Sequence, residues 1–234
     1  MGTYGDQCAT HCHLTRQDQD DFAVRSYVRA REAISAGYFQ REIVPVPVVA
    51  KKQTVLVNLD DGPSRFDEAK LRALRPAFSD SGTVTAGNAS SINDGAAALI
   101  LATGDECERR HWKPLARIAG YATHSREPEW FTLAPIDAIR RLLQQLDWSL
   151  ADTDLFEINE AFSCVALAAE RELGIPAEKV NIHGGAVSLG HPIGCSGARI
   201  LVTLVHALER TGGRRGIACL CVGGGEAVAV AVER

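Results

Sequence analysis

The first part of the chain predicts one long helix followed by a hairpin. Thr15 and Asp18 form a capping-box pattern, in which a threonine hydroxyl can accept an unpaired backbone N–H at a helix start. An apolar stripe at helical spacing follows as far as Gly37, the expected end of the helix. Apolar runs at 43–49 and 54–59 predict two strands around the polar segment 51–53, and Pro45 and Pro47 place the first at a sheet edge.

The middle of the chain is less regular. Residues 60–82 are polar and predict an irregular segment that carries the basic positions Arg65, Lys70, Arg72 and Arg75. Residues 82–103 predict a strand, a loop of small residues and a buried alanine-rich helix.

The second half alternates between the two periodicities. Strands are predicted at 115–122, 155–158, 217–222 and 227–232, and helices at 135–147, 160–173 and 195–210. The last two strands are expected to be antiparallel neighbours joined across 223–225. Alternating strands and helices indicate an α/β layered fold with a domain boundary near residue 113.

Composition narrows the class of protein. Apolar residues make up 46% of the 234 positions and charged residues 23%, which excludes disorder. The net charge of −4 argues against nucleic-acid binding, and no apolar run reaches the ~18 residues that a membrane span needs. Seven cysteines, an odd number, indicate reduced intracellular thiols, and the first residues lack a secretory-signal pattern.

Three glycine-rich or polar segments concentrate reactive residue types. Asn159 follows a predicted strand, where its amide could face a ligand or, with equal weight, cap a helix. Residues 181–197 hold five glycines, so they predict a shaped loop rather than a regular element. His191 in that loop is the candidate acid, base or oxyanion donor, with His183 as its competitor.

Cysteine supplies the other candidate groups. Cys221 ends a predicted strand beside Gly223, and a catalytic thiol there would need a basic neighbour such as His191; the alternative is a small core residue, the role expected for Cys164 and Cys219. The cluster Cys8, His11, Cys12 and His13 lacks a second ligand pair at zinc-site spacing, so metal binding there is disfavoured.

Together these segments resemble the thiolase family, and within it most closely the acetyl-CoA acetyltransferases. NEAF at 159–162, NIHGGAVSLGHPIGCSG at 181–197 and CVGGG at 221–225 occur in the family's order. The resemblance extends through TVTAGNASSINDGAAA at 83–98 and the segment 15–46, so it covers nearly the whole chain. It implies a layered αβα fold with a loop and CoA-binding region at 1–92, a remnant of the N-terminal domain at 93–113 and the C-terminal domain at 114–234.

The resemblance also implies roles for single residues. His191 would activate a nucleophilic cysteine and, with a water held by Asn159, form one oxyanion hole. Cys221 would be the acid/base that takes the α-proton of acetyl-CoA, and the N–H of Gly223 would help form a second oxyanion hole. Ala227 stands where the family often has glycine.

Substrate and ion sites follow from the same resemblance. The positions implied for coenzyme A are Tyr27, Arg65, Phe66, Asp67, Lys70 and Ser90. Those implied for a potassium ion are Tyr27, Ala86, Gly87, Ala89 and Val187. No cofactor is required for the chemistry, and Phe131 resembles the enzymes that accept a 2-methyl branch.

The family's acylated cysteine belongs to an earlier segment, so we expect this chain to lack it and to be inactive and poorly stable alone. The alternatives are a non-catalytic CoA-binding relative and a longer-chain 3-ketoacyl-CoA thiolase. A ketoacyl synthase is disfavoured, because those enzymes use histidine where this chain has Cys221. We expect a dimer or tetramer in a cytoplasmic or mitochondrial location, with no nucleic-acid or membrane partner.

Overall fold

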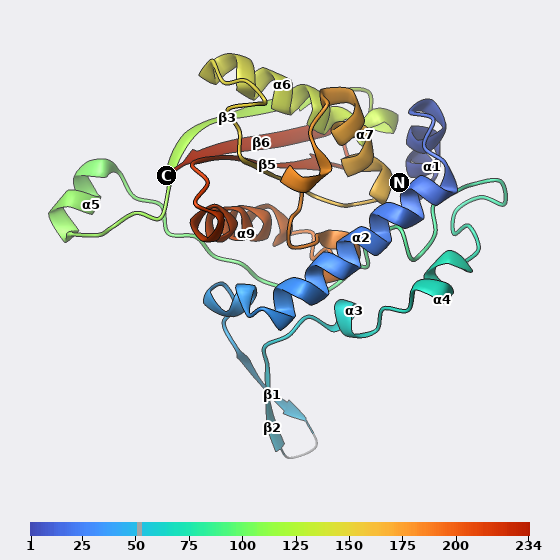
Figure 1. The fold of residues 1–234 in the computed structure, drawn as a ribbon, viewed down its shortest axis with the longest axis horizontal. Coiled ribbons are helices and arrows are strands. Elements are labelled where there is room, and N and C mark those ends of the chain that lie inside the picture. Colours follow the sequence, from blue (N-terminus) through green and yellow to red (C-terminus); the bar gives the residue numbers. More distant parts are fainter. Residues whose placement is uncertain (51–52) are drawn as a thin grey trace.

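Helices cover both faces of a four-stranded sheet in the computed structural model of the chain, which describes residues 1–50 and 53–234 (Figure 1). The strands are β3 (Arg117–Ser125), β4 (Leu155–Ile158), β5 (Arg215–Val222) and β6 (Glu226–Glu233), in the order β3-β6-β5-β4. β4 and β5 run parallel and the other neighbours run antiparallel. The predicted α/β class and the antiparallel final pair are confirmed.

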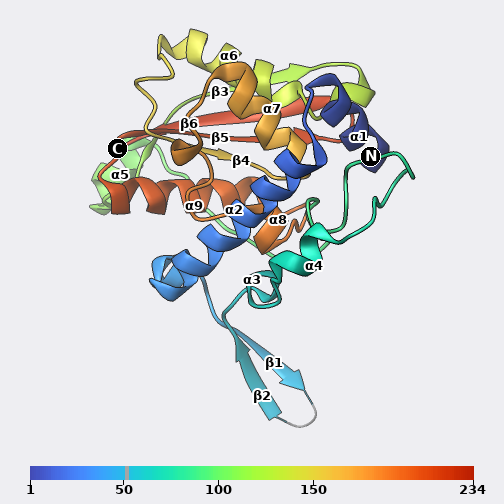
Figure 2. The ribbon, with the colours of Figure 1, turned by 45° about the vertical axis from the view of Figure 1, so that its right-hand side comes forward.

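Alternation along β5 explains how two helical layers can share one sheet. Ile217, Cys219 and Cys221 pack in the core cluster that includes α6 (Ala134–Leu146) and α7 (Ser163–Leu173). Ala218 packs in a second cluster with α9 (Ser196–Thr211), which lies along the opposite face (Figure 2). Because side chains of a strand alternate in direction, one apolar strand can support both layers.

Two N-terminal helices lie against this body. α1 (Gly2–His11) packs on α7, and α2 (Arg16–Ser35) crosses α7 and the short α8 (Ala186–Leu189). The predicted capping box is present, since the Thr15 hydroxyl accepts from the Asp18 N–H at 3.0 Å. Gly37 adopts a left-handed conformation with φ of 72°, which confirms it as the end of the helical segment. The short helices η1, η2 and η3 span Tyr38–Arg41, Pro128–Trp130 and Ala177–Lys179.

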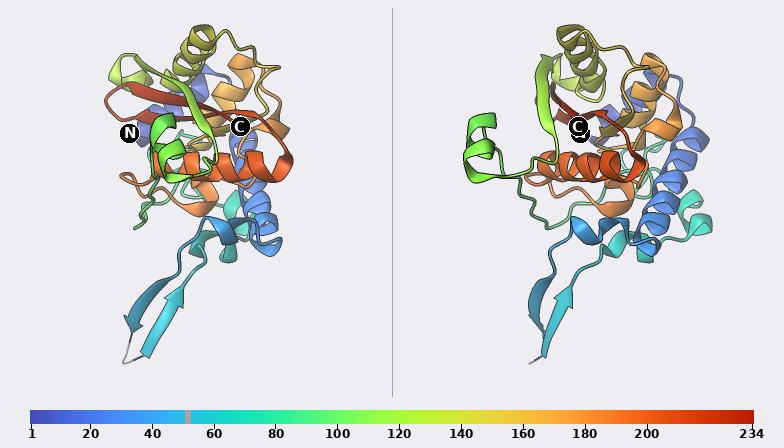
Figure 3. Two further views of the ribbon diagram at one scale, coloured as in Figure 1. Left: turned by 90° about the vertical axis from the view of Figure 1, so that its left-hand side faces the viewer. Right: turned by 60° about the vertical axis from the view of Figure 1, so that its left-hand side comes forward.

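The predicted hairpin forms and projects from the body (Figure 3). Its strands, β1 (Val46–Ala50) and β2 (Gln53–Val57), pair antiparallel, with Pro47 opposite Leu56. Of the expected turn, Gln53 belongs to β2, and residues 51–52 lie outside the described part of the chain.

Three predictions for the middle of the chain are wrong. The strand expected from residue 82 is absent, since the described residues 83–86 have no regular structure. Residues 60–82 contain two short helices, α3 (Asp61–Ser64) and α4 (Glu68–Arg72), the second capped by Asp67. The alanine-rich helix is absent from the described residues 91–103, which have no regular structure and leave Ile100 87% exposed. An apolar run takes its structure from the elements that cover it, and most of these residues are exposed. Helix α5 (Gly104–Arg110) begins only afterwards, where the Thr103 hydroxyl accepts from the Glu106 N–H.

None of the helices in residues 1–50 and 53–234 is long and apolar enough to cross a bilayer.

Candidate active site

Asn159 lies directly after β4 at the edge of the sheet where the parallel strands end. Its backbone N–H donates to the Cys219 carbonyl of β5 at 2.9 Å, and its side chain is buried. The amide nitrogen lies 3.5 Å from His191 Nε2, while Oδ1 is buried with no partner among the described residues. Helix α7 has Phe162 as its N-cap, so the alternative role of Asn159 as a helix cap is excluded.

The glycine-rich loop is fastened to β4 by two buried side chains that sequence reasoning did not single out. The Asn181 side-chain oxygen accepts from the Ile158 N–H, and its nitrogen donates to the Ile158 carbonyl, each at 2.8 Å. The same nitrogen also donates to Glu160 Oε1. Glu160 Oε2 accepts from the Ser26 hydroxyl and the Val187 N–H. Asn181 and Glu160 each belong to one of the recognised motifs, but only the fold shows that their side chains connect those motifs. The loop also contains α8, contrary to the prediction that it holds no regular element.

His191 is held on three sides. Its backbone N–H donates to the Ser91 carbonyl at 3.0 Å, Nδ1 lies 2.6 Å from Ser196 Oγ, and Nε2 faces Asn159. Burial, followed by the positive charge of Arg199, lowers the pKa of His191 below its ordinary value. The ring is therefore neutral near pH 7, and one of its nitrogens keeps a lone pair.

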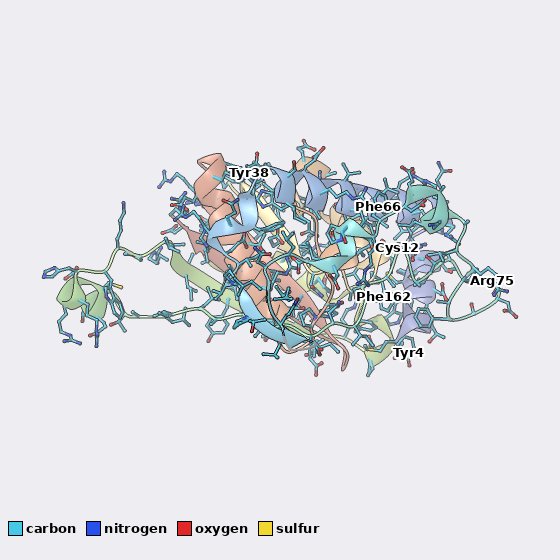
Figure 4. The ribbon with its side chains drawn as sticks, turned by 90° about the horizontal axis from the view of Figure 1, so that it is seen from below. Tyr4, Cys12, Tyr38, Phe66, Arg75 and Phe162 are labelled. Carbon is cyan, nitrogen blue, oxygen red and sulfur yellow. The ribbon has the colours of Figure 1, made fainter. Side chains whose placement is uncertain are left out.

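His183, the competing histidine, has a structural environment. It is buried between Tyr38 and Phe39, at ring-centroid distances of 5.3 and 5.9 Å, and its Nε2 contacts the Arg210 guanidinium (Tyr38 in Figure 4). Burial and the nearby positive charges of Arg210 and Arg29 lower its pKa to about 4. Arg210 also stacks on Tyr38 at 3.9 Å, so His183 belongs to a packed cluster away from Asn159.

Cys221 lies near the end of β5, one strand away from Asn159. It pairs in register with Ala227 and is buried in the same core cluster as Cys8. Burial raises its pKa to about 12, and His191 is not among the groups that perturb it. A Cβ on Gly223 would lie 2.9 Å from Met1 Sδ, so the chain's first residue lies directly against this glycine.

Cys8, Cys164 and Cys219 pack in the main apolar core cluster, and Cys12 lies against it. All seven thiols are free. Cys8 Sγ approaches the Cys164 carbonyl at 4.0 Å, and the His11 ring lies tilted against Trp130. The hydrogen bond with Cys8, followed by burial, raises the pKa of Cys12. The pKa of Cys8 is also raised, because the contact with Cys164 and burial outweigh the lowering effect of Cys12. Throughout residues 1–50 and 53–234, no group of three or more His, Cys, Asp or Glu side chains is arranged to hold a metal ion.

The structure brings together only some of the residues expected at the CoA site. Tyr27 and Phe66 stack with ring centroids 4.6 Å apart (Phe66 in Figure 4). Arg65 pairs with Asp61 at 2.9 Å, and both side chains are exposed. Lys70 is exposed beside Asp67, whose carboxylate caps α4.

One further residue expected at the CoA site is Ser90. The Ser90 hydroxyl donates to the Ala161 carbonyl at 2.9 Å, next to the Asn159 motif. Arg75 projects from the outer loop at the rim of the molecule (Figure 4). Phe131, the residue expected to bear on branched substrates, is buried edge-on to Tyr4.

Three of the residues expected around potassium lie near Leu71, whereas Ala89 packs in the main core cluster. Tyr27 and Val187 pack in one small cluster with Leu71, and a Cβ on Gly87 would lie 2.8 Å from Leu71 Cγ. Asn88 holds the intervening turn by accepting from the Thr85 N–H and donating to Asp20. Within the described chain, the carbonyls of residues 86, 87 and 89 accept no hydrogen bond.

Comparison with known proteins agrees with this geometry. A family profile described as "Thiolase, N-terminal domain" matches residues 1–105, and one described as "Thiolase, C-terminal domain" matches residues 112–234. The mouse protein named "Acetyl-CoA acetyltransferase, cytosolic" is 48% identical over the whole chain, which covers 60% of it. The crystal structure of the Bacillus anthracis acetyl-CoA acetyltransferase superposes with a TM-score of 0.97 at 46% identity. The Ascaris suum thiolase Acat5 in complex with coenzyme A gives a TM-score of 0.94 at 43% identity. Each match covers the whole of this chain and 59% of the solved chain.

Proposed function

The chain belongs to the thiolase family, and we propose that it carries the acid/base and oxyanion part of an acetyl-CoA C-acetyltransferase. Such an enzyme condenses two acetyl-CoA molecules to acetoacetyl-CoA and runs the reverse thiolysis. The observation that supports this function best is the contact of Asn159 with a neutral His191 at the end of β4. We also propose the division into 1–92, 93–113 and 114–234.

His191 and Asn159 would serve the acylation step. A nucleophilic thiol gives its proton to the free lone pair of His191 while its sulfur attacks the acetyl carbonyl. The resulting imidazolium N–H and a water bound to the unpartnered Asn159 Oδ1 then stabilise the oxyanion. Collapse of the intermediate releases CoA as a thiolate, which needs a proton.

The raised pKa of Cys221 suits it to supply that proton. A thiol with a pKa of about 12 is protonated at rest, and once it has given its proton to the CoA thiolate it is a strong base. It would then take the α-proton of the second acetyl-CoA. The enolate carbon attacks the acetyl group of the acyl-enzyme, and the Gly223 N–H stabilises the negative charge that develops on the acetyl oxygen. His191 then returns its proton to the departing nucleophilic cysteine. Protons balance over the cycle, and the products are acetoacetyl-CoA and one free CoA.

Coenzyme A and potassium sites belong to the same proposal. Tyr27 and Phe66 offer a stacked aromatic surface, Arg65 and Lys70 offer charges for phosphates, and Ser90 lies beside the Asn159 motif. The carbonyls of Ala86, Gly87, Ala89 and Val187, with the Tyr27 hydroxyl, would hold a potassium ion. Bound there, the ion would supply a fixed positive charge that orders the turn. Phe131 would bear on acceptance of a 2-methyl branch.

We further propose a homo-oligomer, in the cytoplasm as the mouse relative's name states for that protein. The hairpin supports an oligomer, because Val49, Val55 and Leu56 are exposed on a two-stranded ribbon that projects from the body. Sedimentation of the wild-type protein should give a dimer or tetramer, and Leu56→Glu should lower its mass; a wild-type monomer would contradict this.

A non-catalytic CoA-binding protein is the second candidate. The observation that favours it is the raised pKa of five thiols, those of Cys8, Cys12, Cys195, Cys219 and Cys221. None of these thiols is therefore activated as a nucleophile.

The two candidates separate in one experiment. Acetoacetyl-CoA thiolysis would be measured for this chain alone and for a chimera that adds the part of the Bacillus anthracis enzyme that the chain does not span. We expect turnover only in the chimera, with a loss of at least ~100-fold in its His191→Ala variant. Turnover by the chain alone would show that one of its own cysteines is acylated. A folded chimera that binds CoA without turnover would instead favour the non-catalytic protein.

A further inference from the structure

Ser196 is a buried side chain at the start of α9 that contacts the candidate catalytic histidine. Its Oγ lies 2.6 Å from His191 Nδ1 and 3.1 Å from the Pro192 carbonyl, to which it donates. The serine hydroxyl has a single hydrogen. The Pro192 carbonyl can only accept, so both contacts of Ser196 Oγ are hydrogen bonds only if the hydroxyl donates to Pro192 and His191 Nδ1 carries the hydrogen directed at Oγ.

The other side of the ring leads to the same assignment. Asn159 presents its amide nitrogen, a donor, to His191 Nε2 at 3.5 Å. A donor facing Nε2 requires a lone pair on that nitrogen. If the hydrogen were on Nε2, two N–H groups would face each other there, and Ser196 would have to release Pro192 to donate to Nδ1.

The backbone fixes the distance between the two side chains. Cys195 and Ser196 donate their N–H groups to the Pro192 carbonyl at 2.8 and 3.0 Å, which closes a tight turn between His191 and α9. The His191 N–H donates to the Ser91 carbonyl, which holds the backbone that carries the ring close to α9. Arg199, one turn along α9, is the charged group that acts on the ring, and its charge favours the neutral imidazole.

From these contacts we propose that Ser196 is a positioning residue that holds His191 in the tautomer with its proton on Nδ1, leaving Nε2 as the atom that accepts a proton. The catalytic meaning of this assignment rests on the proposed function, since Nε2 faces the place where a nucleophilic thiol would give up its proton. The tautomer itself does not depend on any activity. A base whose tautomer is fixed in advance needs no rearrangement during the reaction.

The test is ¹⁵N NMR of the full 234-residue chain with labelled histidine, with the His191 signals identified by their absence in His191→Gln. We expect the neutral wild-type ring to carry its proton on Nδ1. In Ser196→Ala the population should move toward Nε2–H by about tenfold, the effect of losing one hydrogen bond. Ser196→Thr, which keeps the hydroxyl, should retain the wild-type tautomer.

Ser163→Ala is the matched control. Ser163 is a buried serine at the start of α7 whose Oγ has no hydrogen-bond partner in the described part of the chain, so its removal should leave the His191 signals unchanged. A wild-type proton on Nε2, or an unchanged tautomer in a folded Ser196→Ala, would overturn the proposal. If Ser196→Ala does not fold, the wild-type spectrum alone still decides. If the chimera shows no thiolysis while the wild-type His191 ring carries its proton on Nδ1, the proposed function is refuted and the assignment of the tautomer remains.

Discussion

His183→Gln should remove a defined part of the protein's acid sensitivity. The folded-state pKa of His183 is about 4, against an ordinary value of 6.5, because the ring is buried beside the Arg210 charge. The unfolded chain therefore binds more protons than the folded chain between these values, so folding stability is complete above pH 6.5 and falls as pH falls toward 4. Integration of this difference gives a loss of about 3 kcal/mol at pH 4.

The measurement is urea unfolding of both proteins at several pH values between 4 and 7.5. Glutamine can still accept from Arg210 but does not titrate, so the free energy of unfolding of the variant should lack the His183 share of the slope. The quantity to analyse is the difference in unfolding free energy between the two proteins at each pH, because Glu157 changes the stability of both with pH in the opposite direction. Burial raises the pKa of Glu157 to about 8, and its contribution is lost as pH rises from about 4.5 to 8. Equal slopes for the two proteins below pH 6.5 would refute the reasoning.

Two other perturbations test the loop and the candidate acid/base. Gly184→Ala should lower the free energy of unfolding in urea by ~3 kcal/mol or more, because Gly184 has a φ of 77° and a Cβ there would lie 2.5 Å from the Ser26 carbonyl oxygen. The control Gly174→Ala, at a φ of 68° with nothing within 4 Å of its Cβ, should lose only the ~1–2 kcal/mol of backbone strain. Similar losses in the two variants would contradict the close approach at Gly184. Iodoacetamide at pH 7.5 should alkylate Cys221 at least ~1000-fold more slowly in the folded protein than after unfolding, because the pKa of this thiol is about 12 instead of the ordinary 9.0. Peptide mass spectrometry would measure the rate of alkylation. Rapid alkylation of the folded protein would show that the Cys221 thiol is not held neutral.

The elements that sequence alone predicted well are those whose signals are local. The Thr15 capping box and the glycine turn between β5 and β6 each depend on a few adjacent residues, and both form as predicted. The alanine-rich segment failed for the opposite reason. An apolar run such as residues 96–102 takes its structure from the elements that cover it, and in this structure Ile100 and Leu101 are largely exposed.

The candidate site divides in the same way. Asn159, His191 and Cys221 could be named because their motifs are distinctive, and the structure places Asn159 against His191 and Cys221 on the neighbouring strand. Ser196 and Asn181 could not be assigned roles, because what each does depends on an atom brought to it by another part of the fold.

The two histidines of one loop show why residue type and local context do not determine a role. His183 and His191 both follow or precede glycine, and burial lowers the pKa of both. The difference lies in their neighbours. The Nε2 of His183 contacts a guanidinium, so its lone pair is already engaged and protonation would place two cations together. The Nε2 of His191 faces a neutral amide at the end of a strand, while its other nitrogen is bound to a serine hydroxyl. A proton taken up by His191 Nε2 would therefore not lie in contact with a second cation, which is why the proposed chemistry is assigned to His191.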